Sequence, residues 1–505
     1  MHNEIILARK YRDRLLCDPY RPAYHIAISD DKGFPADPNG AFFADGVYHL
    51  MHIYKSSENG SYNWRHLSSI DAIHWRHHCD ALTDLNGDGG CYSGGAFVDD
   101  DGVAYLSFWK FPSKNAGEDL GGIALAYSYP PYEKWQRMEE VAIECTDIWG
   151  ITEAEIDGET VHLGCADPSN IWKSNGKYYI QTGNLVLLDN YGRSDDSEEK
   201  YKGDFTDLFS SDDLKKWKYV GRFYKNPHPG LDGYPDLSED GMCPSFLPLF
   251  DAEENGKPTG KYLQLFISHN KGCQYYIGRF EEEKFIPEQH GRMTWGDIAY
   301  FAPEALIDGK NRHIMWAWVR EDVDGCFEKF GWSGVLSAPR NLWYENGELK
   351  MAPISELSSL EYGHIAYSED DGDRVKVGDG ELCRIKGIWE NSGTCGVAVR
   401  VFDDGKRGVE IYYSPDEKKL IMDTTKCGGE GWLIREAAPF ELRCGEKLEL
   451  DIMIDKSVIE VYANRRQAIC RRVYIPDSEA GLGVRIIGEK PEKLDTYRMF
   501  PSNPY

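Results

Sequence analysis

Three stretches of the sequence place acidic side chains in settings that restrict them, and acidic side chains are the groups that cleave glycosidic bonds. Asp37 opens the run Asp37-Pro38-Asn39-Gly40, and Asp167 also stands directly before a proline. Proline holds the preceding residue in an extended backbone, and Asn-Gly predicts a tight turn after Asp37. Glu239 and Asp240 stand together ahead of a Cys-Pro pair. Cleavage takes one carboxylate at the anomeric carbon and one carboxylic acid at the leaving oxygen, and these residues could supply both. Taken alone, Asp-Pro-Asn-Gly is more typical of a structural turn, whereas two adjacent acids ahead of a Cys-Pro pair would be unusual as a structural feature if that loop is buried.

The segments around these acids predict a mainly β protein. Short alternating or aromatic segments bounded by Gly, Asp and Asn recur about every ten residues, for example at 47–54, 104–109, 177–182 and 313–318. A Ser-x-Asp-x-x-x-Trp frame occupies 69–75 and 211–217, with a degenerate copy at 127–135. Repeated strand-turn-Trp units favour a β-propeller, in which each blade packs on the next. Two unrelated strand ends that share Asp and Trp are the alternative.

A chain of 505 residues predicts more than one domain, because single hydrophobic cores stop growing near ~250–300 residues. The sequence pattern changes around residues 352–367, from Trp-rich segments to evenly spaced segments with the alternation of strands. Segments 449–454 and 458–462 form a predicted hairpin with one buried face, as in a β-sandwich. We therefore expect a catalytic domain over 1–355 and a β-sandwich domain over 356–505.

The overall composition limits the molecules that the protein is expected to bind and the cellular compartment in which it is expected to lie. With 84 acidic and 57 basic residues, the formal charge of −27 would repel nucleic acid and anionic membrane surfaces, so a small-molecule saccharide is the expected partner. Charged residues interrupt the first 16 positions, no stretch approaches the ~18 apolar residues of a membrane span, and the 13 cysteines form no Cys-x-x-Cys pair. We expect a cytoplasmic protein with reduced cysteines, no metal and no cofactor. The oligomeric state stays open.

A series of motifs in order along nearly the whole chain resembles glycoside hydrolase family 32, the family of invertases, inulinases and levanases. The N-terminal matches are Arg21-Pro22-x-Tyr24-His25, Asp37-Pro38-Asn39-Gly40, Gly46-x-Tyr48-His49-Leu50, Trp64-x-His66 and Asp71-x-x-His74-Trp75. Further matches lie at 91–96, 167–168, 239–244, 331–340 and 457–464.

The resemblance implies an all-β fold, a five-bladed β-propeller followed by a C-terminal β-sandwich, and release of fructose from β-fructofuranosides with retention of configuration. Asp37 would be the nucleophile, Asp167 would stabilise the transition state, and Glu239 would be the acid/base. Glu239 is chosen because some relatives carry a Glu-Asp-x-x-Cys-Pro form of this motif, with Asp240 as the fallback. The remaining residues expected to bind substrate are Asn39, Trp64, Ser93, Asp240 and Trp295. For each Trp, burial between blades is the alternative.

Four departures from the family pattern all concern the sugar site. Phe34-Pro35-Ala36 replaces a usual Trp-Met-Asn, Ile53 replaces a Gln, Ala166 replaces an Arg, and Met242 stands where a Glu commonly precedes the cysteine. Each lost hydrogen bond to a neutral sugar removes ~0.5–1.5 kcal/mol, so we expect altered sugar recognition. We also expect burial and the charge of Asp37 to raise the pKa of Glu239.

Three other functions remain open on the sequence. The same scaffold could carry a fructosyltransferase or a hydrolase of difructose anhydrides. An inverting arabinan- or xylan-cleaving enzyme shares the five-bladed architecture and uses a wider carboxylate spacing. A fructoside-binding propeller that has lost its catalytic acid is the non-enzymatic alternative.

Overall fold

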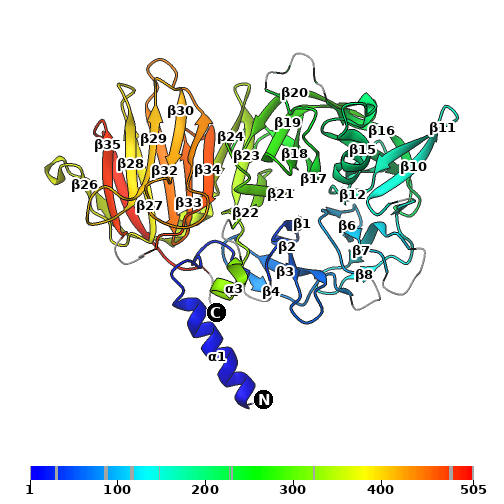
Figure 1. Ribbon diagram of the computed structural model, residues 1–505, viewed down its shortest axis with the longest axis horizontal. Coiled ribbons are helices and arrows are strands. Elements are labelled where there is room, and N and C mark those ends of the chain that lie inside the picture. The colour runs from blue at the N-terminus through cyan, green and yellow to red at the C-terminus, as the bar shows by residue number, and fades with distance from the viewer. Residues whose placement is uncertain are drawn as a thin grey trace. The chain divides into compact units, whose positions relative to one another are not determined.

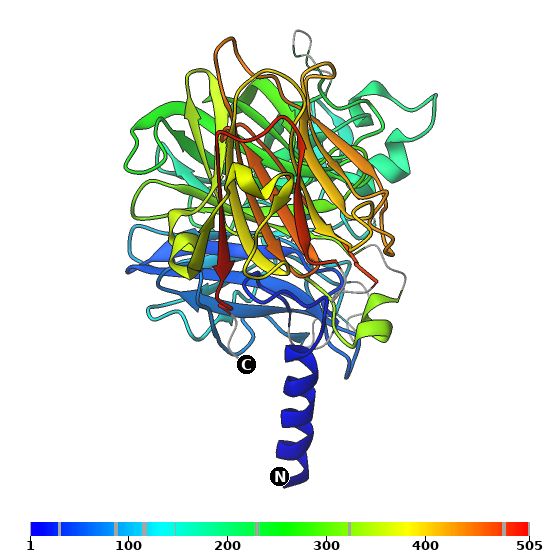
Figure 2. The same cartoon turned by 90° about the vertical axis from the view of Figure 1, so that its left-hand side faces the viewer.

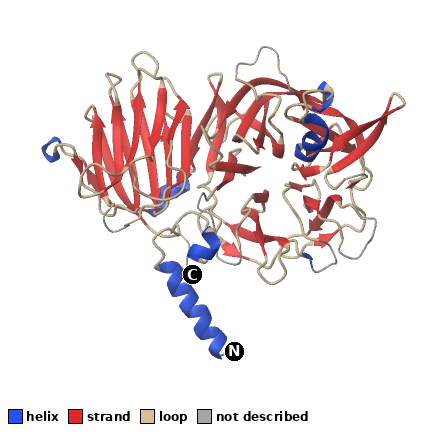
Figure 3. Ribbon diagram, viewed as in Figure 1, coloured by secondary structure: helices blue, strands red, loops and turns tan. Residues whose placement is uncertain are grey.

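The computed structural model describes residues 2–28, 32–84, 89–113, 119–146, 148–226, 228, 231, 233–321, 325–476 and 481–502. Strands dominate these residues, which confirms the predicted all-β class (Figure 3). The helical elements are short, apart from the first: α1 (His2–Leu16), α2 (Leu185–Leu187), η2 (Leu188–Gly192), η3 (Glu199–Tyr201), α3 (Cys326–Phe330), η4 (Ser355–Leu360) and η5 (Glu369–Asp371). No helix within the described ranges is long and apolar enough to cross a membrane.

The chain divides into two compact units. The N-terminal unit comprises Ile28–Trp318 and Trp332–Gly347, and the C-terminal unit comprises Met1–Ala27, Val319–Gly331 and Glu348–Tyr505. Residues 1–27 therefore pack with the C-terminal half of the chain, whereas the sequence predicts them in the N-terminal domain. The reason is a buried carboxylate: Asp455 accepts hydrogen bonds from the backbone N–H groups of Ala23, Tyr24 and His25, at 2.6–2.8 Å.

Five sheets of four or five strands follow one another between residues 38 and 353, and each is built mainly by pairing strands that are close in sequence. The first two sheets are β1 (Pro38–Ala44), β2 (Val47–Lys55), β3 (Tyr62–Ser69), β4 (Arg76–His77); and β5 (Ala96–Val98), β6 (Ala104–Lys110), β7 (Gly122–Ser128), β8 (Gln136–Arg137), with β9 (Ile143–Glu144) beside β7. The third is β12 (Ala166–Pro168), β14 (Lys177–Gly183), β15 (Phe205–Ser211), β16 (Lys218–Lys225), with β13 (Trp172–Ser174) beside β14. The last two are β17 (Met242–Phe250), β18 (Pro258–Ser268), β19 (Gly272–Glu281), β20 (Lys284–Arg292); and β21 (Tyr300–Ile307), β22 (His313–Val319), β23 (Arg340–Glu345), β24 (Glu348–Pro353). A separate hairpin joins β10 (Ile151–Ile156) to β11 (Glu159–Gly164).

The first strands of four of these sheets, β1, β12, β17 and β21, lie toward the centre of the N-terminal unit (Figure 1). β1 contacts β5 and β21, β12 contacts β6 and β17, and β17 contacts β21. The contacts therefore link the inner strands in a ring that is completed through β6, the neighbour of β5, and residues at the starts of these strands can converge although they lie far apart in sequence.

The repeated Ser-x-Asp-x-x-x-Trp frame has the same structure at both copies. Ser69 donates to Asp71, which also accepts from the backbone N–H groups of residues 73 and 74. Ser211 donates to Asp213, which accepts from the N–H groups of residues 215 and 216. Each copy follows the third strand of its sheet, β3 or β15, so the repeat marks equivalent turns and is not a chance resemblance.

Bulges interrupt three of the inner strands near their first residues. The pairing register shifts between Asn39 and Phe42 in β1, between Ala166 and Pro168 in β12, and between Met242 and Ser245 in β17. The predicted tight turn at Asn39-Gly40 is therefore wrong: both residues belong to β1, and the positive φ of Gly40, 54°, serves the bulge. Bulges redirect side chains, and here they occur beside the predicted catalytic residues.

The C-terminal unit contains two six-stranded sheets, as a β-sandwich requires. One has the order β25 (Glu361–Ala366), β36 (Lys493–Met499), β27 (Leu382–Trp389), β32 (Leu448–Asp455), β33 (Val458–Ala463), β34 (Gln467–Arg472). The other has the order β26 (Arg374–Val375), β35 (Gly483–Gly488), β28 (Cys395–Val401), β29 (Val409–Ser414), β30 (Lys419–Asp423), β31 (Arg435–Pro439). The predicted hairpin is confirmed as β32 and β33, with Asp455 opposite Val458. In the same unit, α1 extends from the sheets as a single helix (Figures 1 and 2).

Candidate active site

Asp37 lies immediately before β1, at the centre of the N-terminal unit. It is 7% exposed, and its backbone carbonyl accepts a hydrogen bond from the N–H of Ile53 on β2. The hydroxyl of Ser93, which precedes β5, donates to Asp37 Oδ2 at 2.5 Å. A hydrogen bond of this kind favours the ionised carboxylate and fixes its orientation. The predicted neighbourhood of Asp37 and Ser93 is therefore present.

Asp167 is the second residue of the bulged strand β12, where its φ is 32°. The thiol of Cys243, on β17, lies 3.3 Å from Asp167 Oδ2 and can donate to it, because burial raises the pKa of that thiol well above its usual value. Burial, then the negative charge of Asp37, raises the pKa of Asp167 to about 7. Asp37 therefore lies close enough to Asp167 for its charge to raise the pKa of Asp167, and that pKa allows Asp167 to exchange a proton near neutral pH.

Glu239 has different surroundings from those expected for an acid/base. Arg292 donates to both of its carboxylate oxygens, at 2.8 and 3.0 Å, and Gln274 donates at 2.8 Å. Burial alone would raise the pKa of Glu239, but the hydrogen bonds and charge of Arg292 outweigh it and leave the pKa below its usual value. The expectation of a raised pKa for Glu239 is therefore wrong.

Asp240, the neighbour of Glu239, lies close enough to Asp167 for their charges to interact. Its negative charge raises the pKa of Asp167, and its Oδ2 lies 2.8 Å from Nδ1 of His269. The backbone N–H of His269 donates to Oδ1 at 3.0 Å. Asp240 is 1% exposed, whereas the His269 side chain is 45% exposed. The sequence reasoning did not single out His269.

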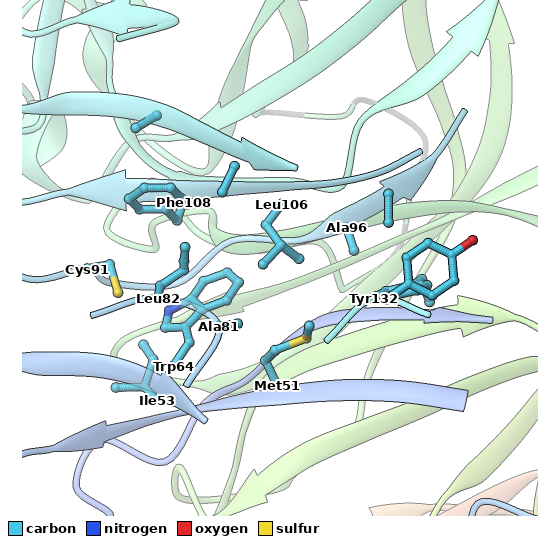
Figure 4. Packing of buried hydrophobic residues seen from close by; sticks show 14 residues of the cluster. Met51, Ile53, Trp64, Ala81, Leu82, Cys91, Ala96, Leu106, Phe108 and Tyr132 are labelled. Atoms are coloured by element: carbon cyan, nitrogen blue, oxygen red, sulfur yellow. The ribbon is translucent and has the colours of Figure 1, made fainter. Parts of the chain in front are cut away.

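The other predicted sugar contacts differ in their positions. The Asn39 amide donates to the carbonyl of Asp37 and accepts from the N–H of Gly94, so it links two sheets through the backbone. Trp64 is 0% exposed within a hydrophobic cluster, which is the alternative that the sequence left open and does not support a stacking role on sugar (Figure 4). Trp295 is half-buried in the segment between β20 and β21.

The four departures from the family pattern also have structural explanations. Ala36, Ile53 and Ala166 are all 0% exposed, and Ile53 belongs to the same hydrophobic cluster as Trp64. Met242 points away from the aspartates, because its sulfur accepts the backbone N–H of Leu185 at 3.3 Å. These positions therefore serve packing in this chain.

Two charged residues near the acids were not predicted, His269 and Arg292. His269 follows β18 directly, and the pairing of Met242 with Ile267 places it across the hairpin from Asp240. Arg292 is the last residue of β20, two strands further along the sheet. The register of β17 with β18 would have located His269, but no local sequence pattern gives that register. Among the described residues, no group of three His, Cys, Asp or Glu side chains is placed to hold a metal ion.

Comparisons with known proteins agree with the motifs. The model described as Glycosyl hydrolases family 32 N-terminal domain matches residues 27–353, and the family 32 C terminal model matches residues 371–496. A sucrose-6-phosphate hydrolase of Vibrio alginolyticus is 24% identical over 94% of each chain. An insoluble β-fructofuranosidase isoenzyme of Arabidopsis thaliana is 25% identical over 68% of this chain, which spans only 58% of that relative.

Solved structures share the fold of the whole chain. The sucrose-6-phosphate hydrolase structure from Lactobacillus gasseri superposes with a TM-score of 0.76 at 19% identity, covering 98% of this chain and 97% of that chain. That structure therefore has the same fold as this chain.

Proposed function

Because the chain belongs to glycosyl hydrolases family 32, we propose that it hydrolyses β-fructofuranosides and releases fructose with retention of configuration. The observation that carries this proposal is the convergence of Asp37 and Asp167 from two different sheets, with Ser93 holding Asp37 and Cys243 beside Asp167. The surrounding strands hold these two carboxylates in position.

In this proposal the two aspartates have different tasks. Asp37, oriented by Ser93, attacks the anomeric carbon and forms a fructosyl-enzyme. Asp167 stabilises the transition state, in which positive charge develops on the sugar ring and a nearby carboxylate becomes more favourable than in the free enzyme. The pKa of about 7 for Asp167 means that its ionised form is costly without substrate and gains stability as that charge develops.

The residues proposed to lie around the sugar differ from those usual in the family. The hydrogen-bonding side chains usual at positions 36, 53 and 166 are replaced by buried alanines and an isoleucine. Phe34, 51% exposed, packs edge-on against Trp318 with ring centroids 5.3 Å apart and offers an apolar face two positions from Ala36. We propose sucrose and short fructo-oligosaccharides as substrates, bound more by apolar contact than is usual.

Fructose release from purified protein tests the proposal directly. The substrates are sucrose, sucrose 6-phosphate, inulin and levan oligosaccharides, because relatives are named for several of these. We expect fructose from at least one of them, whereas silence on all would overturn the proposal. Chromatography of the products separates hydrolysis from transfer of fructose to a second sugar, and binding without turnover would indicate an inactive relative.

The remaining proposals concern the arrangement of the sheets, the domain boundary and the location of the protein in the cell. We propose that the five sheets from β1 to β24 are five blades of a propeller, supported by the ring of inner strands. A boundary near residue 355 is supported by family models that end at 353 and resume at 371. A cytoplasmic location is proposed from the sequence, and the burial of nine of the 13 cysteines as free thiols is consistent with it.

A further inference from the structure

We propose that His269, held by the buried carboxylate of Asp240, is the acid/base of this enzyme, in place of a glutamate. The inference rests on the proposed fructoside hydrolysis and assigns the one catalytic task that the aspartates leave unfilled. Asp240 acts as a positioning residue, and His269 carries the proton.

The geometry of the β17–β18 hairpin brings this pair together. Both oxygens of Asp240 are engaged by His269, one by the backbone N–H at 3.0 Å and one by Nδ1 at 2.8 Å. The hydroxyl of Ser268 donates to the backbone carbonyl of Asp240 at 2.8 Å, which fixes the strand end. An imidazole bound through Nδ1 directs Nε2 away from Asp240, and the 45% exposure of the side chain leaves it accessible to a substrate.

The charges around His269 suit a proton donor beside the nucleophile. Partial burial opposes its protonation, but the hydrogen bond and charge of Asp240, followed by the charges of Asp167 and Asp37, raise its pKa above the usual value. The ring of Phe301 packs edge-on against the imidazole, with centroids 5.6 Å apart. The three acidic charges therefore favour the protonated form of His269, which lies within the field of the two aspartates that act on the sugar.

Neither neighbouring carboxylate fits the task as well. Glu239 is 1% exposed and is neutralised by Arg292, which stabilises its ionised form and opposes proton donation. Asp240 is 1% exposed, and both of its oxygens already accept hydrogen bonds from His269. Met242, at the position where a glutamate is common, points toward Leu185. Of these side chains, His269 combines exposure with an available proton.

The proposed steps balance without any added reactant but water. In the first step a carboxylate oxygen of Asp37 bonds to the anomeric carbon, the bond to the leaving oxygen breaks, and that oxygen takes the Nε2 proton of His269. In the second step neutral His269 takes a proton from water as the water oxygen bonds to the anomeric carbon. The bond between the anomeric carbon and Asp37 breaks as the water oxygen bonds, and its electron pair returns to the carboxylate, so both residues regain their starting states.

The test compares two substrates in the wild type and two variants. Sucrose needs a protonated leaving group, whereas 4-nitrophenyl β-fructofuranoside has a leaving group that departs without protonation. His269→Asn keeps a donor toward Asp240 but cannot supply a proton, so we expect a ~10²–10⁴-fold loss of fructosyl-enzyme formation from sucrose and a loss of about tenfold or less from the aryl fructoside. Glu239→Gln should affect both substrates equally, because Glu239 is assigned no proton transfer.

The pH dependence gives a second readout. The alkaline limb of kcat/KM should follow His269, and Asp240→Asn should move it to lower pH because the hydrogen-bonded charge that stabilises the imidazolium is removed. An NMR titration of the His269 ring, identified by its loss in His269→Asn, should show the same shift without turnover.

The outcomes separate this inference from the proposed function. Suppose that the wild type is active and that Glu239→Gln, but not His269→Asn, loses more activity on sucrose than on the aryl fructoside. That result would overturn the His269 assignment and leave fructoside hydrolysis intact. An unperturbed His269 titration in Asp240→Asn would also overturn it. A wild type that cleaves neither substrate would overturn the function and the assignment together.

Discussion

Ionised Asp167 destabilises the folded protein. Burial and the charge of Asp37 raise its pKa to about 7 from an ordinary value of 3.8. Between about pH 4 and 7 the unfolded chain loses this proton while the folded protein keeps it, so rising pH favours unfolding, and the cost is constant above pH 7. The pKa of Asp167 in the folded protein lies about three pH units above its ordinary value, and this difference corresponds to ~4 kcal/mol of stability.

Asp167→Asn should remove this cost. At pH 8 we expect the variant to be more stable than wild type by roughly 3–4 kcal/mol, with a smaller gain at pH 5, because the amide has no charge to bury. Denaturant unfolding at the two pH values measures the difference, and fructose release should fall at both. A stability gain that does not grow with pH would show that Asp167 is already ionised in the free protein.

At the scale of elements, the bulge in β1 follows Asp37 closely along the chain. Gly40 has a φ of 54°, and a Cβ there would lie 2.9 Å from Leu106 and 3.1 Å from Met51 and Trp64. Gly40→Ala should therefore cost both the strain of a positive φ and a steric clash, about 2–4 kcal/mol together, and should reduce activity by displacing Asp37.

A second glycine provides the matched control. Gly46 has a φ of 80°, but a Cβ there meets nothing within 4 Å, so Gly46→Ala should cost only the conformational term of about 1 kcal/mol and leave activity unchanged. Thermal unfolding and fructose release measure both effects. Equal losses in the two variants would mean that the close packing at Gly40 has no role in positioning the nucleophile.

The elements also show which parts of the site the sequence could predict. The motif around Asp37 and the Asp-Pro pair at Asp167 are local patterns that single out both residues. They do not give the local backbone: a bulged strand replaces the turn predicted after Asp37, and Asp167 has a φ of 32° and not the extended backbone expected before proline. The choice between Glu239 and Asp240 depends on the bulge in β17, which no local pattern reveals. His269 depends on the register between two strands, and the burial of Trp64 depends on three-dimensional packing.

At the scale of the whole molecule, a buried ion cluster secures the start of the chain to the C-terminal unit. His25 lies 2.8 Å from Asp455 and 3.2 Å from Glu460, and all three side chains are 0% exposed. Burial opposes protonation of His25, but hydrogen bonds to the two carboxylates raise its pKa to about 9. The unfolded histidine loses its proton near pH 6.5 while the folded one keeps it to about pH 9.

His25→Gln should therefore change how stability depends on pH. The stabilisation from protonated His25 is complete below pH 6.5 and is lost as pH rises to about 9, a loss of ~3 kcal/mol in wild type that the variant should lack. Unfolding of the C-terminal unit at pH 6 and 9 measures it. His74→Gln, at a histidine with a 53% exposed side chain, is the control and should keep the wild-type dependence.

The attack of Asp37 on a fructoside is the central claim, and replacing its carboxylate tests it most directly. Fructose release from the best substrate is measured for wild type and Asp37→Asn, together with the unfolding temperature of each. The amide keeps the size of the side chain but cannot attack, so we predict an unchanged fold and a fall in turnover of roughly 10⁴-fold or more. An Asp37→Asn protein that stays folded and releases fructose at a rate near that of wild type would contradict the account.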